Sequence, residues 1–178
     1  YAPRKNLWSI IQIASQIPRT HFIIAGSTKT AGSSKVLHEL ESLMDKFRIR
    51  NVTLEKDVPK RKLIDYYVKA KVYLHPLYIE HFGISIAEGA AAGAVPVVYR
   101  DGGGWLDIAS RIHPSLGYTN IREAAHVVRT LLHDDALWLK LSRKSVEITR
   151  DLSWDNYKMR LKKSIEETLT QKRILNHS

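Results

Sequence analysis

Two carboxylates frame a short glycine-containing segment in the middle of the chain. The segment spans residues 80–84, with the sequence Glu-His-Phe-Gly-Ile, and Glu88 follows about one helical turn later. A glycine directly before a helix leaves backbone N–H groups unpaired at the positive end of the helix dipole, which favours a phosphate. Glu88 could then accept hydrogen bonds from both hydroxyls of a ribose, as an acidic residue does in dinucleotide-binding folds. Each feature alone also fits an ordinary turn and a solvent-facing glutamate.

Small residues surround Glu88 on the helix predicted here. Alanines at positions 87, 90, 91 and 92 would let this helix lie close to a sheet, and we expect Glu88 on its apolar side. A run of three glycines, residues 102–104, gives a second place where a ligand could approach the backbone. A close ligand, a loop that moves and a plain turn all explain such a run.

Four short apolar runs bounded by turn residues predict β-strands. They span residues 21–25, 52–54, 72–75 and 95–99. Segments with helical periodicity alternate with these runs, which predicts an α/β fold with a Rossmann-like, doubly wound parallel sheet flanked by helices. Ligands bind such sheets at the carboxyl ends of the strands, so the loops after residues 25, 75 and 99 form the candidate site.

The two ends of the chain differ from the middle. Beyond Tyr118 only helical periodicity is found, and we expect three helices that pack on the flank of the sheet. Residues 151–153 offer an N-cap to the last of them, and residues 176–178 are expected to fray. A helical segment over residues 6–16 opens the chain with no strand before it. Since a doubly wound domain usually opens with a strand, we expect this chain to be a fragment of a longer protein.

Composition restricts the function further. The 178 residues contain no cysteine and carry a net charge of +10. The lack of thiols excludes disulfides and thiolate catalysis, and suits a reducing, cytoplasmic compartment. Much of the positive charge lies between residues 140 and 173 at helical spacing, which fits a solvated helix face, an anionic membrane surface or a pyrophosphate-bearing ligand. We expect no nucleic-acid partner, and allow peripheral contact with the cytoplasmic face of a membrane.

Several common catalytic motifs are missing from the chain. It has no Gly-x-Gly-x-x-Gly, no Gly-Lys-Ser/Thr loop, no His-Glu-x-x-His and no Gly-x-Ser-x-Gly. Dinucleotide, P-loop, zinc-protease and serine-hydrolase functions therefore have no motif to support them. Asp-x-Asp, which clamps a metal ion on a diphosphate in other enzymes, is missing too. Helix dipoles and basic side chains would then have to neutralise a leaving diphosphate.

The spacing of the two carboxylates resembles the Glu-x7-Glu signature of glycosyltransferase family 4, whose members have the GT-B fold. Residues 89–98 are similar to the small-residue helix and strand that follow it in this family, and Gly102-Gly103 to its Gly-Gly loop. Residues 1–6 resemble the end of its Arg-x-x-Pro-x-Lys-Asn/Gly segment, and residues 152–154 its Phe-Ser-Trp motif. The loop at residues 27–34 departs from the family, because it lacks the common Gly-x-Gly. The resemblance covers nearly the whole chain.

This resemblance implies a role for each matching residue. Lys5 and the backbone at the helix start would bind the diphosphate of a nucleotide sugar, and Glu88 would hold the ribose. The backbone near Val58 would meet the base, and Glu80 would be the catalytic residue that contacts the transferred sugar. No metal cofactor is implied. The donor-binding set is Lys5, Val58, Phe82, Gly83, Ile84 and Glu88.

The resemblance also implies a function for the chain. Residues 1–178 would form one nucleotide-sugar-binding domain of a retaining glycosyltransferase. That domain would need an N-terminal GT-B domain of the same parent chain, and would be inactive alone. The motifs are most similar to dolichol-pathway mannosyltransferases, which favours GDP-mannose as donor over a UDP-sugar, and a glycan or lipid-linked acceptor. The alternatives are half of a GT-B nucleotide-sugar epimerase and a basic binding module without catalysis.

Overall fold

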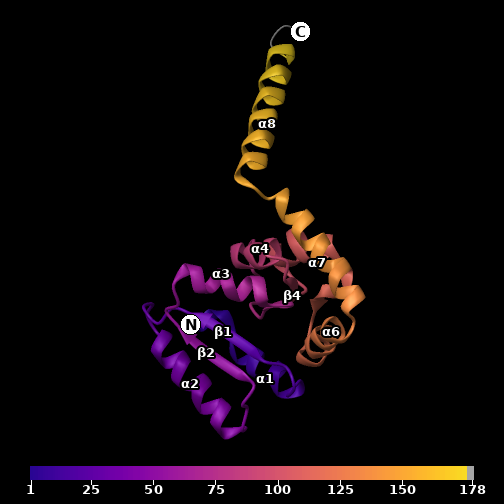
Figure 1. Ribbon diagram of the computed structural model, residues 1–178. Helices are drawn as coiled ribbons and strands as arrows, with labels where there is room; N and C mark the ends of the chain where they lie inside the picture. The colour runs from indigo at the N-terminus through magenta and orange to yellow at the C-terminus, as the bar shows by residue number, and fades with distance from the viewer. Residues whose placement is uncertain (176–178) are drawn as a thin grey trace.

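Parallel strands covered by helices on both faces form the body of the molecule (Figure 1). The computed structural model describes residues 1–175, with side chains up to residue 171. The strands are β1 (Phe22–Gly26), β2 (Val52–Lys56), β3 (Val72–His75), β4 (Val95–Tyr99) and β5 (Gly117–Tyr118). The α-helices are α1 (Trp8–Gln16), α2 (Ser33–Lys46), α3 (Lys60–Lys69), α4 (Ile84–Ala91), α5 (Ser110–Ile112), α6 (Ile121–His133), α7 (Asp135–Arg150) and α8 (Trp154–Leu175). The shorter helical turns are η1 (Pro3–Lys5), η2 (Gly104–Ala109) and η3 (Pro114–Leu116).

The strands form two parallel sheets, one of two strands and one of three. β1 pairs with β2, with Phe22 opposite Val52, and β3, β4 and β5 pair in that order. Backbone hydrogen bonds do not join β1 to β3 within residues 1–175. Phe22 of β1 and Leu74 of β3 nevertheless pack against both hydrophobic cores. The predicted parallel α/β fold is therefore confirmed, and side-chain packing rather than a ladder holds its two parts together.

The predicted strands agree closely with the structure. The runs at residues 72–75 and 95–99 coincide with β3 and β4, and the other two begin or end within two residues of β1 and β2. Residues 95–98 are fully buried, which explains their unbroken apolar run, because a strand covered on both faces needs no alternation. The sequence analysis did not predict β5, because two residues are too few to show an apolar run or an alternation.

Two hydrophobic cores hold the helices on the sheet. One core lies around β4 and takes side chains from α5, α6 and α7, and the other lies between β1, β2 and the pair α1 and α2. The fully buried residues of the first include Ile13, Ile86, Val95, Val97, Ile108, Leu116 and Leu131, and those of the second include Ala14 and Leu40. α4 lies close to β3, because Gly89 leaves room for the ring of Tyr73. The predicted close packing of α4 is confirmed at Ala90, which is fully buried, but not at Ala91, which is exposed.

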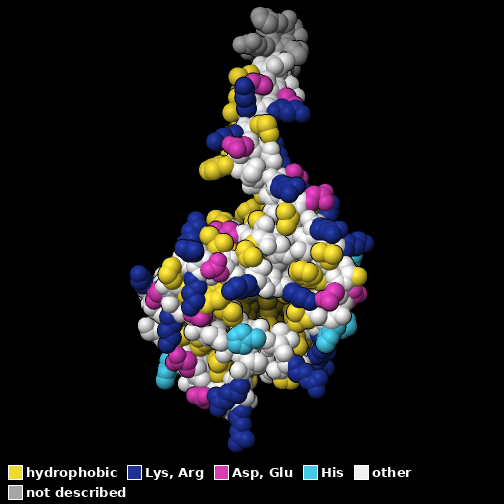
Figure 2. Space-filling view, in the orientation of Figure 1, with side chains coloured by type: hydrophobic (Ala, Val, Ile, Leu, Met, Phe, Trp, Pro, Cys, Tyr) yellow, Lys and Arg dark blue, Asp and Glu magenta, His cyan; other side chains and the backbone are white. Residues whose placement is uncertain are grey.

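The last helix, α8, contradicts the expectation that every C-terminal helix packs on the sheet. It projects away from the body of the molecule (Figure 1), and Trp154 and Tyr157 are 72% and 54% exposed. Figure 2 shows hydrophobic side chains along α8, interleaved with basic and acidic ones. Periodicity predicts an apolar stripe on a helix but says nothing of the surface that receives it, which is why the expectation was wrong.

The packing of α6 and α7 and the start of α8 agree with the sequence analysis. α6 and α7 bury Val128, Leu131, Leu141 and Ile148 against the sheet, as predicted. The predicted N-cap of α8 is confirmed, because the Ser153 hydroxyl accepts a hydrogen bond from the Asn156 N–H at 3.3 Å. The expected fraying of residues 176–178 lies outside the described residues. Among the helices of residues 1–175, none has the length and apolar character needed to cross a membrane.

Candidate functional site

The candidate site lies at the carboxyl ends of the strands, beside the start of α4. Gly83 caps this helix with a φ of 85°, and a Cβ there would meet Ile86 Cδ1 at 2.4 Å. Only glycine fits this position without strain. Phe82 and Ile84 on either side are 38% and 71% exposed, whereas Gly83 itself is buried. The first turn of a helix leaves N–H groups without helical partners, and these can bind an anion.

Glu80 is the centre of the polar contacts at this site. Its Oε2 lies 3.2 Å from Lys5 Nζ and 2.9 Å from His75 Nε2. The Glu80 side chain is 15% exposed, Lys5 is 34% exposed and His75 is only 5% exposed. Sequence analysis predicted Lys5 and Glu80 as separate contacts of one ligand, and the structure joins them directly, 75 residues apart in the chain.

The protonation states follow from these contacts. Burial by itself would raise the pKa of Glu80, but the hydrogen bonds and charges of Lys5 and His75 outweigh it and hold the pKa below its ordinary value. Burial lowers the pKa of His75, against the opposing effect of the Glu80 carboxylate. Glu80 is therefore ionised at neutral pH and His75 is neutral. Since an ionised carboxylate only accepts hydrogen bonds, the His75 Nε2 must carry the proton and donate it.

The N-terminal segment carries Lys5 to the site. Residues 3–5 form the turn η1, which ends at Asn6 with a φ of 49°. The Asn6 amide Nδ2 donates to the Pro76 carbonyl at 3.1 Å, in the loop that follows β3. α1 begins two residues later, so the start of the chain is tied to both the β3 loop and the body of the domain.

The glycine run explains how the backbone of Glu80 is held. The Gly103 N–H donates to the Glu80 carbonyl at 2.6 Å, and the Ile79 N–H donates to the Asp101 carboxylate at 2.8 Å. A Cβ at Gly102 would lie 2.4 Å from the Glu80 carbonyl oxygen, and one at Gly103 would lie 1.7 Å from that of His81. The glycines therefore allow two loops of the chain to touch, a reason that sequence analysis did not consider.

Glu88 does not lie where sequence analysis expected it. Ile86, Gly89 and Ala90 form the buried side of α4, and Glu88 is exposed. The expectation that it lies on the apolar side was wrong because neighbours at several angles around a helix were counted as one face. Glu88 faces α3 instead: burial raises the pKa of Tyr67, and the Glu88 carboxylate adds to that rise. Glu88 follows Ile84 by one turn and shares its exposed face, and its contact with a ribose stays a prediction.

Val58 lies half-buried in the loop between β2 and α3. The preceding residue, Asp57, has a φ of 48° and accepts hydrogen bonds from the Ser27 hydroxyl at 2.9 Å and the Thr28 N–H at 3.0 Å. Thr28 also donates its hydroxyl to Asp57, and the hydrogen bonds from Thr28 and Ser27 lower the pKa of this carboxylate. These contacts join the loops that follow β1 and β2. Hydroxyl-bearing side chains thus connect the loop after β1, in which the expected Gly-x-Gly is missing, to the loop after β2.

Sequence analysis missed two residues of this region, His75 and Asp57. His75 is the one strongly polar side chain of β3, and a polar residue at the carboxyl end of a buried strand was a signal that could have been used. Asp57 gave no such signal, because its partners lie 29 and 30 residues away. Across the part of the chain that the structure describes, no three His, Asp or Glu side chains gather to hold a metal ion. The expectation that no metal is required stays a prediction.

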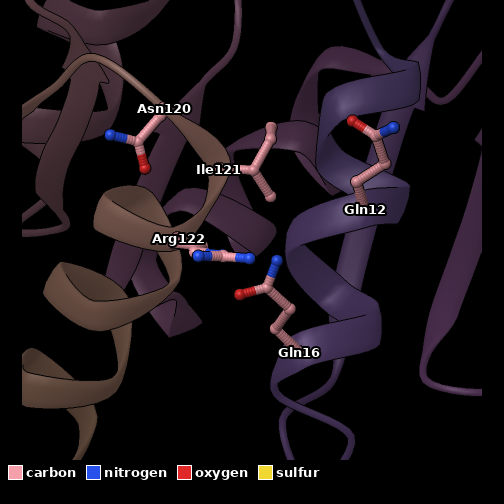
Figure 3. A pocket seen from close by; sticks show the side chains of 5 residues that line it. All are labelled: Gln12, Gln16, Asn120, Ile121 and Arg122. Carbon is pink, nitrogen blue, oxygen red and sulfur yellow. The ribbon is translucent and has the colours of Figure 1, made fainter.

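A surface hollow lies apart from these residues. It has a volume of about 460 Å³ between α1 and the start of α6, and Figure 3 shows the side chains around it. Its lining residues are Gln12, Gln16, Asn120, Ile121 and Arg122. None of them belongs to the predicted site. The candidate site therefore rests on the contacts at Glu80 and not on this hollow.

The fold places the chain in a class of protein. Parallel strands with helices on both sides match solved GT-B structures, and the chain is one half of that fold. Sucrose-phosphate synthase from Thermosynechococcus elongatus superposes with a TM-score of 0.79 over 96% of this chain and 44% of that one, at 20% identity. The catalytic domain of starch synthase IV from Arabidopsis thaliana gives 0.70 over 95% of this chain and 37% of its own, at 16% identity. Likeness at these identities establishes the fold alone.

The family follows from the sequence itself. Residues 1–150 match the family described as Glycosyl transferases group 1, and the chain belongs to this family. A protein of Dictyostelium discoideum named GDP-Man:Man(3)GlcNAc(2)-PP-Dol alpha-1,2-mannosyltransferase is 25% identical over 89% of this chain and 32% of its own length. The Xenopus laevis protein of the same name is 32% identical over 53% of this chain and 19% of its own length. The chain thus spans no more than about a third of these two relatives.

Proposed function

We propose that this chain is the donor-binding domain of a retaining glycosyltransferase that takes its sugar from a nucleotide sugar. The observation that carries the proposal is the pairing of Lys5 with Glu80 beside the start of α4. A cation and a helix start suit a diphosphate, and a fixed carboxylate beside them suits a sugar hydroxyl. Membership of the glycosyltransferase family agrees with this chemistry.

The arrangement suggests how each group would act on a bound donor. The diphosphate would lie against the backbone of residues 82–84 and take the Lys5 ammonium, which is exposed enough to turn toward it. Both described contacts of the Glu80 carboxylate fall on Oε2, which leaves Oε1 for a hydroxyl of the sugar. Glu88 would hold the ribose and the backbone near Val58 would meet the base.

In a retaining transfer the diphosphate leaves, and the acceptor attacks, on the same face of the sugar. The protein then has to stabilise the charge that develops on the diphosphate and to orient the two substrates. Lys5 and the start of α4 would supply the first of these effects, without a metal ion. Glu80 would orient the sugar of the donor. An N-terminal GT-B domain of the same protein would bind the acceptor, so the isolated domain would not transfer sugar.

We further propose GDP-mannose as the donor and a lipid-linked glycan as the acceptor. The Dictyostelium discoideum and Xenopus laevis relatives, at 25% and 32% identity, both carry the name GDP-Man:Man(3)GlcNAc(2)-PP-Dol alpha-1,2-mannosyltransferase. The Glu-His-Phe-Gly segment and the basic character of the chain agree with such substrates. Such an acceptor would bring the protein to the cytoplasmic face of a membrane.

Calorimetry on the chain tests the binding site. GDP, UDP and ADP would be titrated into the wild type and into Lys5→Ala and Glu88→Ala. Lys163→Ala is the matched control, because the Lys163 side chain is 77% exposed and lies on α8, which projects away from the body of the molecule. We expect binding that weakens roughly tenfold in Lys5→Ala, the loss of one charge-assisted contact. Affinities equal to the wild type in both site variants would mean that the site is misplaced.

A second experiment tests the donor and the need for another domain. The full-length protein would be offered GDP-mannose, UDP-glucose and UDP-N-acetylglucosamine in competition, and the chain alone would be assayed beside it. We expect transfer from GDP-mannose by the full-length protein and none by the chain. A preference for either UDP-sugar would refute the mannose assignment, and robust transfer by the chain alone would refute the two-domain requirement.

A further inference from the structure

His75 is a buried polar residue at the edge of the candidate site. Its side chain is 5% exposed, and its Nε2 lies 2.9 Å from Glu80 Oε2. The surrounding structure fixes the ring. His75 pairs with Val98 in the parallel ladder, its carbonyl accepts a hydrogen bond from the buried Tyr118 hydroxyl at 3.1 Å, and its ring stacks on Tyr73 at a centroid distance of 6.2 Å.

In the proposed function, Lys5 has two tasks, because it pairs with Glu80 and also serves the diphosphate. Its ammonium is about one-third exposed on a flexible stem, and the proposed function assigns the same charge to the diphosphate. When Lys5 turns to the diphosphate, the Glu80 side chain loses one of its two described partners. His75 has no competing task, because its ring is enclosed and its Nε2 already points at the carboxylate.

We infer that His75 is a positioning residue, which keeps Oε2 of Glu80 fixed so that Oε1 meets the transferred sugar while Lys5 serves the diphosphate. This inference rests on the proposed function of the site. It assigns to His75 no contact with the donor. A hydrogen bond from the His75 ring N–H to the ionised Glu80 carboxylate restricts that carboxylate to one orientation. A contact from Oε1 to one particular sugar hydroxyl requires such a fixed orientation. The backbone bond from Gly103 to Glu80 fixes the other end of the same residue.

Variants of His75 in the full-length protein test the inference. His75→Phe keeps a ring of similar size and removes the donor, whereas His75→Gln keeps an N–H donor near the position of Nε2. We expect kcat to fall roughly tenfold or more in His75→Phe, the loss of one hydrogen bond to a charged group, and to return to within about threefold in His75→Gln. The affinity for GDP, which lacks the sugar, should change less than about twofold in both variants. If His75→Phe does not fold, as judged by thermal unfolding, His75→Asn replaces it, because its shorter amide does not reach Glu80.

A double substitution separates this role from a structural one. In a Glu80→Gln background, His75→Phe should lower kcat by less than about twofold, because the group through which it acts is already altered. Equal losses in both backgrounds would overturn the inference, and so would an unchanged kcat in His75→Phe. A wild-type protein that neither binds GDP nor transfers sugar from any nucleotide sugar would instead refute the proposed function.

Discussion

Gly103→Ala tests the contact between the glycine run and the Glu80 loop. Gly103 has a φ of −67°, which any residue adopts, so the substitution strains no torsion. The added Cβ would instead lie 1.7 Å from the His81 carbonyl oxygen and 2.9 Å from the Asp107 carboxylate. The two loops must separate, and the 2.6 Å hydrogen bond from Gly103 to the Glu80 carbonyl is weakened or lost.

The expected cost follows from these contacts. Overpacking of this kind costs about 1–3 kcal/mol. A domain of this size loses about 2–4 °C in melting temperature for each kcal/mol, so a fall of roughly 2–12 °C is expected. If the Glu80 loop moves, the start of α4 moves with it. The loss of one hydrogen bond between the start of α4 and the nucleotide, worth about 1 kcal/mol, would weaken nucleotide binding about fivefold.

Gly93→Ala is the matched control for this substitution. Gly93 precedes β4 at its amino end, away from the site, and has a φ of 94° with only Ser142 Oγ near its Cβ position, at 3.3 Å. An alanine there costs about 1–2 kcal/mol through the backbone alone. We expect a lower melting temperature but unchanged nucleotide affinity. Thermal unfolding and calorimetry on the two variants decide the matter, and a Gly103→Ala variant with wild-type values in both would refute the loop contact.

Two further predictions concern Glu80 and α8. The folded pKa of Glu80 is depressed, so its contribution to stability is present above the unfolded pKa of about 4.3 and is lost as the pH falls through the folded value. The melting temperature of Lys5→Ala should therefore lie below that of the wild type at pH 7. This difference in melting temperature should shrink on acidification below pH ~4.3. A difference that stays constant with pH would contradict the ion pair between Lys5 and Glu80. A chain ending at Ser153 should keep its melting temperature within about 2 °C, because the described apolar side chains of α8 are exposed, and a larger loss would show that α8 stabilises the domain.

The sequence predicted the fold well because the signals it needed are local. The strands β3 and β4 are short apolar runs, and Gly83 is followed by a helix whose Gly89 and Ala90 are buried. Parallel strands bring their carboxyl ends to one edge, so the candidate site could be assigned to the loops that follow them. The resemblance carried by the Glu80 and Glu88 spacing indicated the family, which the match over residues 1–150 confirmed.

Sequence alone determined the longer strands and helices, and the family resemblance assigned Lys5, Gly83 and Glu80 to one site at the carboxyl ends of the strands. Tertiary structure decided how they interact, because those interactions join residues far apart in the chain. Lys5 and Glu80 are 75 residues apart, and no pattern in either segment shows that they form an ion pair. The same holds for the packing of Gly103 on His81 and for the exposed surface of α8. Such contacts depend on where whole elements lie, whereas periodicity and turn residues report only on their own neighbours along the chain.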